Sequence, residues 1–229
     1  MSVVIPVVDP QRYWPDDLVR TLASAEVEVV VVCARPARPP ESLLAGVRCI
    51  SAPPSRGGQI AVGVQHSTHD CIWVLHADTT AVDAALNYLL HDVVQCSDEC
   101  GRDGYVWGRF DVHIDGVRWV AALMNLRSRI TRICTGDQGM FFRRAALELV
   151  GGYPVLPLME DIEVSKRLAR TLPRSFRAPR ISISTSGRRW QQQGWLSTIV
   201  RMWWFRLRYF AGVPAAQLYQ EYYADRSLL

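Results

Sequence analysis

Four groups of polar residues in the chain carry side chains that suit phosphate and hydroxyl chemistry. His76-Ala77-Asp78 is the first, and it directly follows the apolar run 71–75. Ligands of an open α/β sheet bind at the carboxyl ends of its strands, so Asp78 should project into that crevice, with His76 pointing the same way. The pair offers one oxygen and one nitrogen ligand to a divalent ion, which would neutralise a diphosphate. In the alternative interpretation, Asp78 only caps the following helix.

The second group is the loop 135–139, in which two glycines flank Asp137 and Gln138. Glycines let the backbone approach a ligand closely, and they leave the two polar side chains free to hydrogen-bond it. Gly136 belongs to the same predicted binding loop. As a bare pattern, the segment is equally typical of a turn.

The third group is the pair Glu160-Asp161, which begins a predicted helix shortly after Pro157. A helix N-terminus stabilises a carboxylate as the anion, so a capping role would account for the pair. The functional interpretation is a general base that takes a proton from an acceptor hydroxyl.

The fourth group, Arg188-Arg189-Trp190, follows a predicted strand at 181–184. Guanidinium groups match phosphate oxygens in a bidentate manner, and the face of a tryptophan suits a sugar ring. Each of the four patterns is weak alone, but their order along the chain makes them reinforce one another.

The elements that must position these groups follow an alternating strand and helix pattern. Such alternation predicts an α/β fold with a mostly parallel central sheet covered by helices on both faces. The predicted strands are 3–8, 27–32, 71–75, 105–114, 140–142 and 181–184, and the predicted helices are 81–94, 118–133, 145–150 and 162–170. Thr80 and Asp83 form a predicted capping box. Strict alternation over 105–114 predicts one strand with one polar face.

Length and composition set the class of protein. The chain has 229 residues, 49% apolar and 21% charged, which predicts one globular domain over 1–190 with a helical extension over 191–229. No apolar run reaches the roughly 18 residues of a spanning helix. The N-terminus lacks a signal pattern and the six cysteines lack a disulfide framework, so we expect free thiols and a cytoplasmic location. Cys96 and Cys100, with His91 nearby, lack a fourth ligand for a closed zinc site.

The positive charge is concentrated in the C-terminal third. Residues 164–220 contain no acidic side chain and eleven basic ones. The run favours an anionic partner, although arginine replaces lysine throughout the chain, Lys166 excepted, and is also a compositional habit.

Residues 195–213 form a predicted amphipathic helix. Its apolar stripe comprises Leu196, Ile199, Val200, Trp203, Trp204, Leu207 and Phe210, with Arg201 and Arg208 on another face. The stripe either lies in an anionic membrane interface, which would make the protein peripheral at the inner face of the membrane, or packs on the sheet or on a second copy in a homodimer.

The motifs together resemble glycosyltransferase family 2. The resemblance rests on SVVIPVV, HADT, WGRFDV, NLRSR, TGDQGMFFRR, VGGYPVLPLMEDIEVSKRL and TSGRRW, and it is most specific between residues 71 and 190. The sequence looks most similar to the bacterial subgroup associated with radical-SAM and selenium-domain proteins and with arsenosugar biosynthesis. The resemblance implies a GT-A (Rossmann-like) fold, a nucleotide-diphosphate sugar donor, a divalent metal (Mg²⁺ or Mn²⁺) and inversion at the anomeric carbon.

The resemblance also implies roles for individual residues. Asp78, with His76 and Ala77, corresponds to the metal and diphosphate motif, and Asp161 of the Glu160-Asp161 pair corresponds to the catalytic base. The remaining assignments are Gly136, Asp137 and Gln138 on the acceptor-side loop, Arg188, Arg189 and Trp190 on the diphosphate side, and Pro6 of SVVIPVV on the donor side.

Two segments depart from the family pattern. Cys33 follows the second strand where many relatives carry an aspartate that reads the nucleotide base, and the loop 55–59 is short. The leading interpretation is a metal-dependent inverting glycosyltransferase with an unknown acceptor. A nucleotidyltransferase is the enzymatic alternative. A catalytically diverged module that binds nucleic acid or an anionic membrane is the other, but it leaves the carboxylates unexplained, so we expect no nucleic-acid partner.

Overall fold

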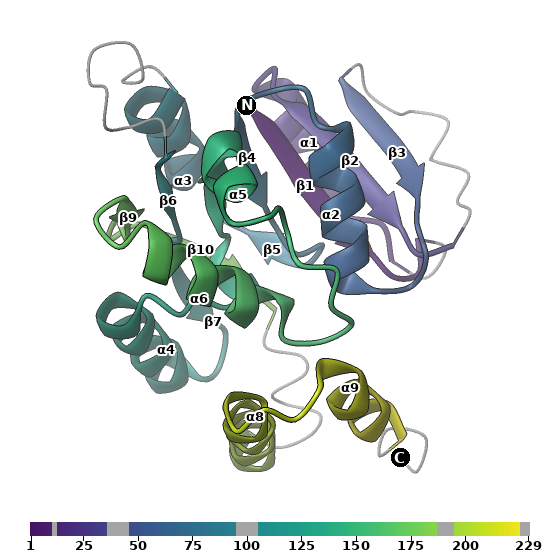
Figure 1. The fold of residues 1–229 in the computed structure, drawn as a ribbon. Helices are drawn as coiled ribbons and strands as arrows, with labels where there is room; N and C mark the ends of the chain where they lie inside the picture. The colour runs from purple at the N-terminus through teal and green to yellow at the C-terminus, as the bar shows by residue number, and fades with distance from the viewer. Residues whose placement is uncertain (11–12, 36–45, 95–104, 187–194, 225–229) are drawn as a thin grey trace.

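The computed structural model of the chain describes residues 1–10, 13–35, 46–94, 105–186 and 195–224, with side chains omitted for 195–199 and 223–224. Two sheets and their covering helices make up the described residues (Figure 1). The larger sheet has seven strands in the order β3-β2-β1-β4-β8-β6-β9. Its strands are β1 (Ser2–Val7), β2 (Glu28–Cys33), β3 (Val47–Ser51), β4 (Cys71–Val74), β6 (Trp107–Gly108), β8 (Phe141–Arg143) and β9 (Phe176–Arg177).

Valine-rich strands form the centre of the molecule. β1 is buried along its whole length and pairs in parallel with both β2 and β4, which is why these strands read as continuous apolar runs. The two faces of the sheet build separate cores, because successive side chains of a strand point to opposite sides.

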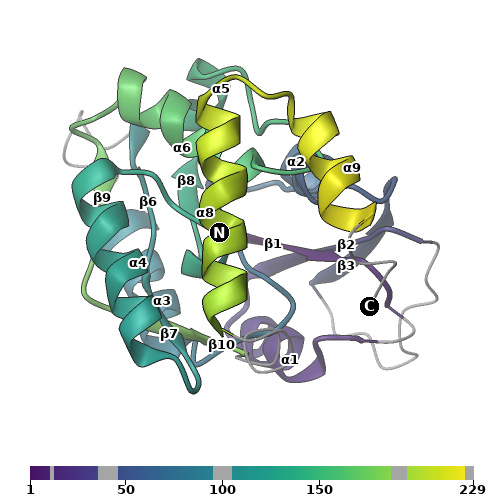
Figure 2. The same ribbon diagram turned by 90° about the horizontal axis from the view of Figure 1, so that it is seen from below.

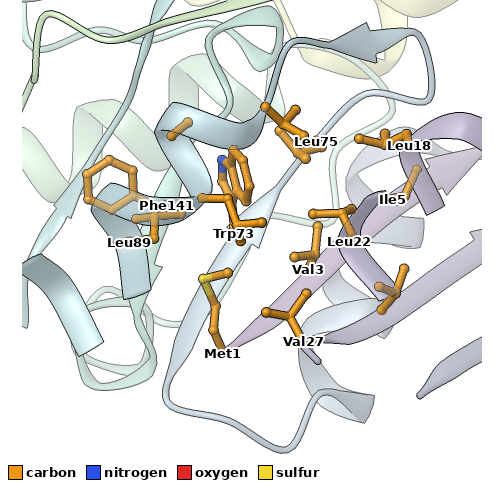
Figure 3. Close-up of a cluster of buried hydrophobic side chains, with 14 of the residues drawn as sticks. Met1, Val3, Ile5, Leu18, Leu22, Val27, Trp73, Leu75, Leu89 and Phe141 are labelled. Carbon is orange, nitrogen blue, oxygen red and sulfur yellow. The ribbon is translucent and has the colours of Figure 1, made fainter. Parts of the chain in front are cut away.

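Helices cover both faces of this sheet. On one face, α1 (Asp16–Ser24) packs Leu18 and Leu22 against Val3 and Ile5, as Figure 3 shows, next to α3 (Asp83–Tyr88) and the π-helical turn Leu89–Val94. The other face is covered by α2 (Arg56–His66), α5 (Arg144–Leu149) and α6 (Glu160–Thr171). The predicted two-sided cover is confirmed.

The antiparallel strand β8 determines which polar loops lie close together. β8 pairs antiparallel with β4, and Trp73 lies opposite Phe141. The segment that precedes β8 therefore begins at the same edge where β4 ends, and this register continues through the hydrogen bond of 2.8 Å from the Val74 N–H to the Met140 carbonyl. The loop 135–139 is brought beside His76 in this way.

The prediction of one strand over 105–114 is wrong. The segment is divided between β6 in the large sheet and β7 (Asp111–Ile114) in a three-stranded sheet of order β5-β10-β7, with β5 at Thr79–Thr80 and β10 at Ser182–Thr185. Between them, Arg109 and Phe110 are fully buried. The predicted polar face is therefore partly interior. Nη1 of the buried Arg109 pairs with Asp111 and Nη2 donates to the Asn125 carbonyl at 2.8 Å, whereas Nε has no partner within the described residues.

Several other local predictions differ from the structure. Thr80 lies in β5 and does not cap a helix; the N-cap of α3 is Val82, without a side-chain cap. The sequence patterns also miss α1, β3 and α2. In α2, three glycines lower the helix propensity, but a Cβ on Gly63 would stand 2.3 Å from a methyl group of Val4, so packing on β1 requires the glycine.

Three further helices complete the fold. α4 (Arg118–Thr131) packs on β7, α8 spans Trp195–Phe210 and α9 spans Ala215–Ala224. Seen from below, α4 and α8 lie side by side, with α9 beyond α8 (Figure 2). Phe205 of α8 is buried with Met159 and Ile162 at the start of α6, together with Leu218 of α9. In the part of the chain that is described, no helix is long and apolar enough to cross a bilayer.

Candidate active site

Three of the predicted groups meet at one edge of the large sheet. His76, just after β4, has its Nδ1 atom 3.0 Å from Oδ1 of Asp137 in the loop before β8. The backbone N–H of Gly136 in the same loop donates a hydrogen bond of 2.9 Å to Oδ2 of Asp161 at the start of α6. His76, the glycine-flanked loop and the acidic pair are thus physically connected.

Gly136 permits this close contact. A Cβ at this position would stand 2.4 Å from Nε2 of His76, so any larger residue would push the imidazole away from the loop. The Nε2 atom itself is buried against the loop and has no hydrogen-bond partner among the described residues. The glycine predicted to admit a ligand therefore admits the His76 ring.

Asp161 is a fixed carboxylate with a small exposed fraction of 7%. Its Oδ1 accepts a hydrogen bond of 2.8 Å from its neighbour's N–H, that of Ile162, and Oδ2 lies 3.6 Å from Nη2 of Arg56. Each oxygen keeps a lone pair beyond these contacts. The site thus presents an oriented acceptor of protons at the edge where the strands end.

Glu160 occupies a different environment from its neighbour. It is 1% exposed and forms an ion pair with Nε of Arg56, while its Oε2 atom has no partner within the described residues. Burial raises the pKa of Glu160 above its usual range, and the Arg56 charge pulls it back only in part. Glu160 holds Arg56, and Asp161 faces the site.

Gln138 corrects one expectation from the sequence. Its side chain is fully buried and is not free for a ligand. The amide nitrogen donates to Ser128 Oγ at 2.9 Å and to Asn125 Oδ1 at 3.2 Å, and the amide oxygen accepts from the Thr135 N–H at 3.2 Å. Gln138 fixes the loop to α4, and only Asp137 points its polar group toward the site.

The sequence implies a divalent ion, which would need side chains as ligands. The described residues contain no group of three or more metal-ligating side chains. His76 does not fit as a ligand, because Nδ1 is on Asp137 and Nε2 is packed under Gly136. Of the two predicted ligands, Asp78 remains; it is partly exposed in the turn after β4. Isolated sites of this kind need oxygens from the ligand to complete the shell.

The other predicted residues fall in different places. Pro6 is buried within β1, opposite Val32 of β2. Ala77 accepts a hydrogen bond of 3.2 Å through its carbonyl from the Tyr13 hydroxyl. Arg188, Arg189 and Trp190 lie outside the described residues, as do Cys96 and Cys100. Cys33 ends β2, and its Sγ atom is 3.6 Å from that of Cys49.

Arg56 contacts the acidic pair but belongs to none of the sequence motifs. It enters from α2, where Ser55 caps the helix by accepting from the Gly58 N–H at 3.2 Å. The neighbouring Gly57 lets α2 press on the loop before α6, since a Cβ there would stand 2.4 Å from the Leu156 carbonyl oxygen. The segment 55–59, expected to be a short loop, is in fact the N-cap and first turn of α2, and its glycines are the sequence signal that marks this contact.

Comparison with known proteins identifies the fold. No family model matches the chain, and no curated protein matches it. Among solved structures, S. aureus TarS 1-349 matches with a TM-score of 0.59 and 16% identity, over 81% of this chain and 60% of that one. Glucosyl-3-phosphoglycerate synthase from Mycobacterium tuberculosis, in complex with Mn²⁺, UDP and glucosyl-3-phosphoglycerate, matches with a TM-score of 0.51 and 15% identity, over 80% of this chain and 70% of that one.

The described residues therefore have the GT-A fold of these glycosyltransferase structures, and the predicted fold class is confirmed. A further TarS 1-349 structure, in complex with UDP-GlcNAc, matches with a TM-score of 0.57 and 17% identity, over 81% of this chain. This chain spans about 60% of the length of the TarS 1-349 structure.

Proposed function

We propose that the chain is an inverting glycosyltransferase that moves a sugar from a nucleotide-diphosphate sugar to an acceptor hydroxyl. The observation that carries the proposal is the convergence of His76, Asp137 and Asp161 on one edge of a GT-A sheet. The similar TarS and glucosyl-3-phosphoglycerate synthase structures contain UDP-GlcNAc or UDP, which supports a uridine nucleotide donor here. We propose further that the chain belongs to the bacterial subgroup associated with radical-SAM and selenium-domain proteins and with arsenosugar biosynthesis.

Asp161 is the proposed catalytic base. Its carboxylate takes the proton of the acceptor hydroxyl while that oxygen attacks the anomeric carbon, and the bond from the sugar to the diphosphate breaks with its electrons on the leaving group. The Gly136 N–H and Arg56 hold the carboxylate in place before the acceptor arrives. Glu160 contributes by positioning Arg56 and does not touch the substrate.

Asp78 is the proposed site for the donor diphosphate and a divalent ion. Mg²⁺ or Mn²⁺ supplies neutralisation of phosphate charge when it is bound. The glucosyl-3-phosphoglycerate synthase structures contain Mn²⁺ or Mg²⁺ with UDP, which supports this choice of ion. We propose that the Asp78 side chain holds the ion only together with the diphosphate, and that Arg188, Arg189 and Trp190 contact the donor from the other side.

Donor binding and donor cleavage test the proposal separately. A thermal-shift panel of UDP-, GDP- and TDP-sugars, with Mg²⁺, Mn²⁺ or chelator, should raise the melting temperature for the true donor and ion, because a ligand of the folded state stabilises it. The same donor with a simple alcohol should yield the nucleoside diphosphate and an inverted glycoside, read by the anomeric proton signal in NMR. Donor binding with retained configuration would contradict the mechanism.

A nucleotidyltransferase is the second enzymatic candidate, since carboxylates and a metal suit that reaction too. It would break a bond to phosphorus, so incubation of a nucleoside triphosphate with a sugar 1-phosphate would release pyrophosphate. The glycosyltransferase instead releases a nucleoside diphosphate. The fold shared with two glycosyltransferases favours the first candidate.

We also propose that 1–190 carries the transferase site and 191–229 forms an attached helical extension. An anionic membrane surface and a second copy of the chain are the two partners considered for the extension, and nucleic acid is not expected. Both partners would meet the protein at α8, whose contacts with α6 bring it close to the proposed base.

A further inference from the structure

Two neighbouring helices expose apolar side chains at helical spacing. On α4, the exposed residues repeat every three or four positions: Trp119, Leu123, Leu126 and Ile130. On α8, the exposed residues follow the same rule: Val200, Trp203, Trp204, Leu207 and Phe210. Each of the nine side chains is about half exposed or more, from 49% for Trp119 to 70% for Ile130. Exposed large apolar groups in such number mark a partner surface.

The two stripes belong to adjacent elements. Met202 of α8 packs against the cluster formed by Val120 and Ala121 of α4, next to Met124. Figure 2 shows the helices lying side by side at the bottom of the molecule. The opposite side of α8 is buried through Phe205, so the helix has one anchored face and one exposed face. We call the exposed residues of both helices the α4–α8 surface.

The charges on α4 and α8 indicate which kind of partner fits this surface. Neither α4 nor α8 contains an acidic residue, and together they contain six arginines. Asp111 and Glu221, from other elements, pair with two of them, Arg129 and Arg208. Arg118, in the first turn of α4, and Arg132, at its C-terminal cap, are exposed. Basic and aromatic side chains flanking an apolar stripe are typical of helices that lie in an anionic lipid interface.

A second copy of the chain fits this surface less well. A two-fold dimer brings the same patch of both subunits together, so arginine-bearing helices would face arginine-bearing helices with no acidic side chain from either. Like charges placed opposite one another oppose association. Anionic phosphates, in contrast, match both the guanidinium groups and the tryptophans.

We propose that the α4–α8 surface docks on an anionic lipid bilayer. The apolar side chains enter the boundary between headgroups and acyl chains, and the exposed Arg118 and Arg132 contact lipid phosphates. The docking itself does not depend on the proposed transferase activity. If that activity holds, the acceptor is carried by the membrane, because the docked helix α8 lies next to the site. The Tyr209 hydroxyl of α8 donates to Glu163 of α6 at 2.6 Å, and the proposed base, Asp161, lies in the same first turn of α6.

Vesicle flotation tests the docking with matched variants. Vesicles contain either phosphatidylcholine alone or equal parts of phosphatidylcholine and phosphatidylglycerol. Leu207→Ala and Leu123→Ala each shorten an exposed side chain of the surface, and Leu149→Ala is the control, since Leu149 is exposed to a similar degree on α5 (53%, against 59% and 57%). We expect each surface variant to lower the partition coefficient by about five- to tenfold, with the control unchanged.

A second pair of variants tests the contribution of the arginine charges to docking. Arg118→Gln should weaken binding to the anionic vesicles and reduce its dependence on salt, whereas Arg20→Gln, an exposed arginine on α1, should not. Thermal melting confirms that all variants are folded.

Three results would overturn the proposal: protein that fails to float with anionic vesicles at low salt, equal flotation with neutral vesicles, or equal loss in the control variants. A dimer in light scattering that Leu207→Ala dissociates would also overturn it, in favour of a second copy. Donor cleavage is measured on the same samples, so a failure of the proposed enzyme activity and a failure of docking are read separately.

Discussion

The two neighbouring carboxylates at the start of α6, Glu160 and Asp161, have different contacts although they are adjacent in the sequence. Asp161 is held by two backbone N–H groups and faces the edge where the strands end, whereas Glu160 points inward to Arg56. The sequence alone indicates an acidic pair suited to base chemistry, but helix geometry points adjacent side chains in different directions. Only the structure separates the proposed base, Asp161, from Glu160, which holds Arg56.

Replacing Asp161 tests the base directly. Asp161→Asn keeps the shape but accepts no proton, so we expect turnover to fall by about 10²–10⁴-fold with donor affinity nearly unchanged. Glu163→Gln, in the same first turn of the helix, is the matched control and should keep turnover. Parent-like turnover in Asp161→Asn would assign the proton transfer to another group.

Variants of Arg56 distinguish its contribution to folding stability from its proposed contribution to catalysis. Arg56→Gln leaves Glu160 buried without its partner, so we expect the free energy of unfolding to fall by about 3 kcal/mol. The double variant Arg56→Gln/Glu160→Gln removes both charges and should regain most of that stability. If Arg56 positions Asp161, the double variant still has a lowered kcat with a similar KM for the donor. Recovery of kcat along with stability would show that the ion pair is only structural.

At the scale of elements, the pattern of the sequence predicts most strands and helices but not how they meet. Continuous apolar runs identify β1, β2 and β4, which are buried on both faces, and helical patterns identify α4 and α6, which bury one face. Periodicity fails for β6 and β7, where an unbroken alternation hides a change of sheet around the buried Arg109. It also misses α2, whose glycines serve contacts with distant segments that no local pattern contains.

The same reason limits what the sequence says about the site. The HADT and TGDQG motifs predict the loops that meet, and their meeting follows from the antiparallel pairing of β4 with β8. The role of Gln138 in fixing α4, and the burial of the His76 Nε2 atom, depend on packing between segments that are far apart in sequence. Tertiary contacts, not residue types, decide which polar groups stay available.

Substitution of Gly136 tests the contact between the loop 135–139 and His76. Gly136→Ala places a methyl group against the His76 ring, so we expect loss of about 1–3 kcal/mol of stability and reduced turnover. His76→Ala in the same chain makes room and should restore most of the melting temperature. Gly58→Ala is the control, because its new Cβ would come no closer than 3.4 Å to Ser55 and 3.8 Å to Val155, and alanine favours the helix. A stable Gly136→Ala single variant would contradict the described contact.

At the scale of the whole molecule, buried or hydrogen-bonded titratable groups set the range of pH in which the chain stays folded. Burial alone would raise the pKa of Glu28, but hydrogen bonds from Ser2, Thr68 and His69 lower it from 4.5 to about 2. Burial raises the pKa values of the Cys33 and Cys134 thiols from 9 to about 12, in Cys33 with a contribution from Cys49. The first group favours the folded state in its charged form, and the thiols favour it in their neutral form.

These shifts predict the two limits of stability in opposite directions. The contribution of Glu28 is complete above pH 4.5 and is lost as pH falls toward 2; that of the thiols is complete below pH 9 and is lost as pH rises toward 12. Urea unfolding at a series of pH values checks both. Glu28→Gln should lower stability near neutral pH by roughly 1–2 kcal/mol and converge on the parent near pH 2, whereas the exposed control Glu148→Gln should follow the parent throughout.

The position of β8 in the sheet has a consequence for the order in which a nascent chain can fold. The strands β1 to β4 pair among themselves, so the first 74 residues can form their part of the sheet as they leave the ribosome. The two residues of β6 pair only with β8 and β9, which are synthesised later. Trp107 therefore stays unpaired until Phe142 emerges, and β6 gains its second neighbour only when Phe176 does. During synthesis, the half of the sheet that carries β6 is the last to become protected from chaperones and proteases.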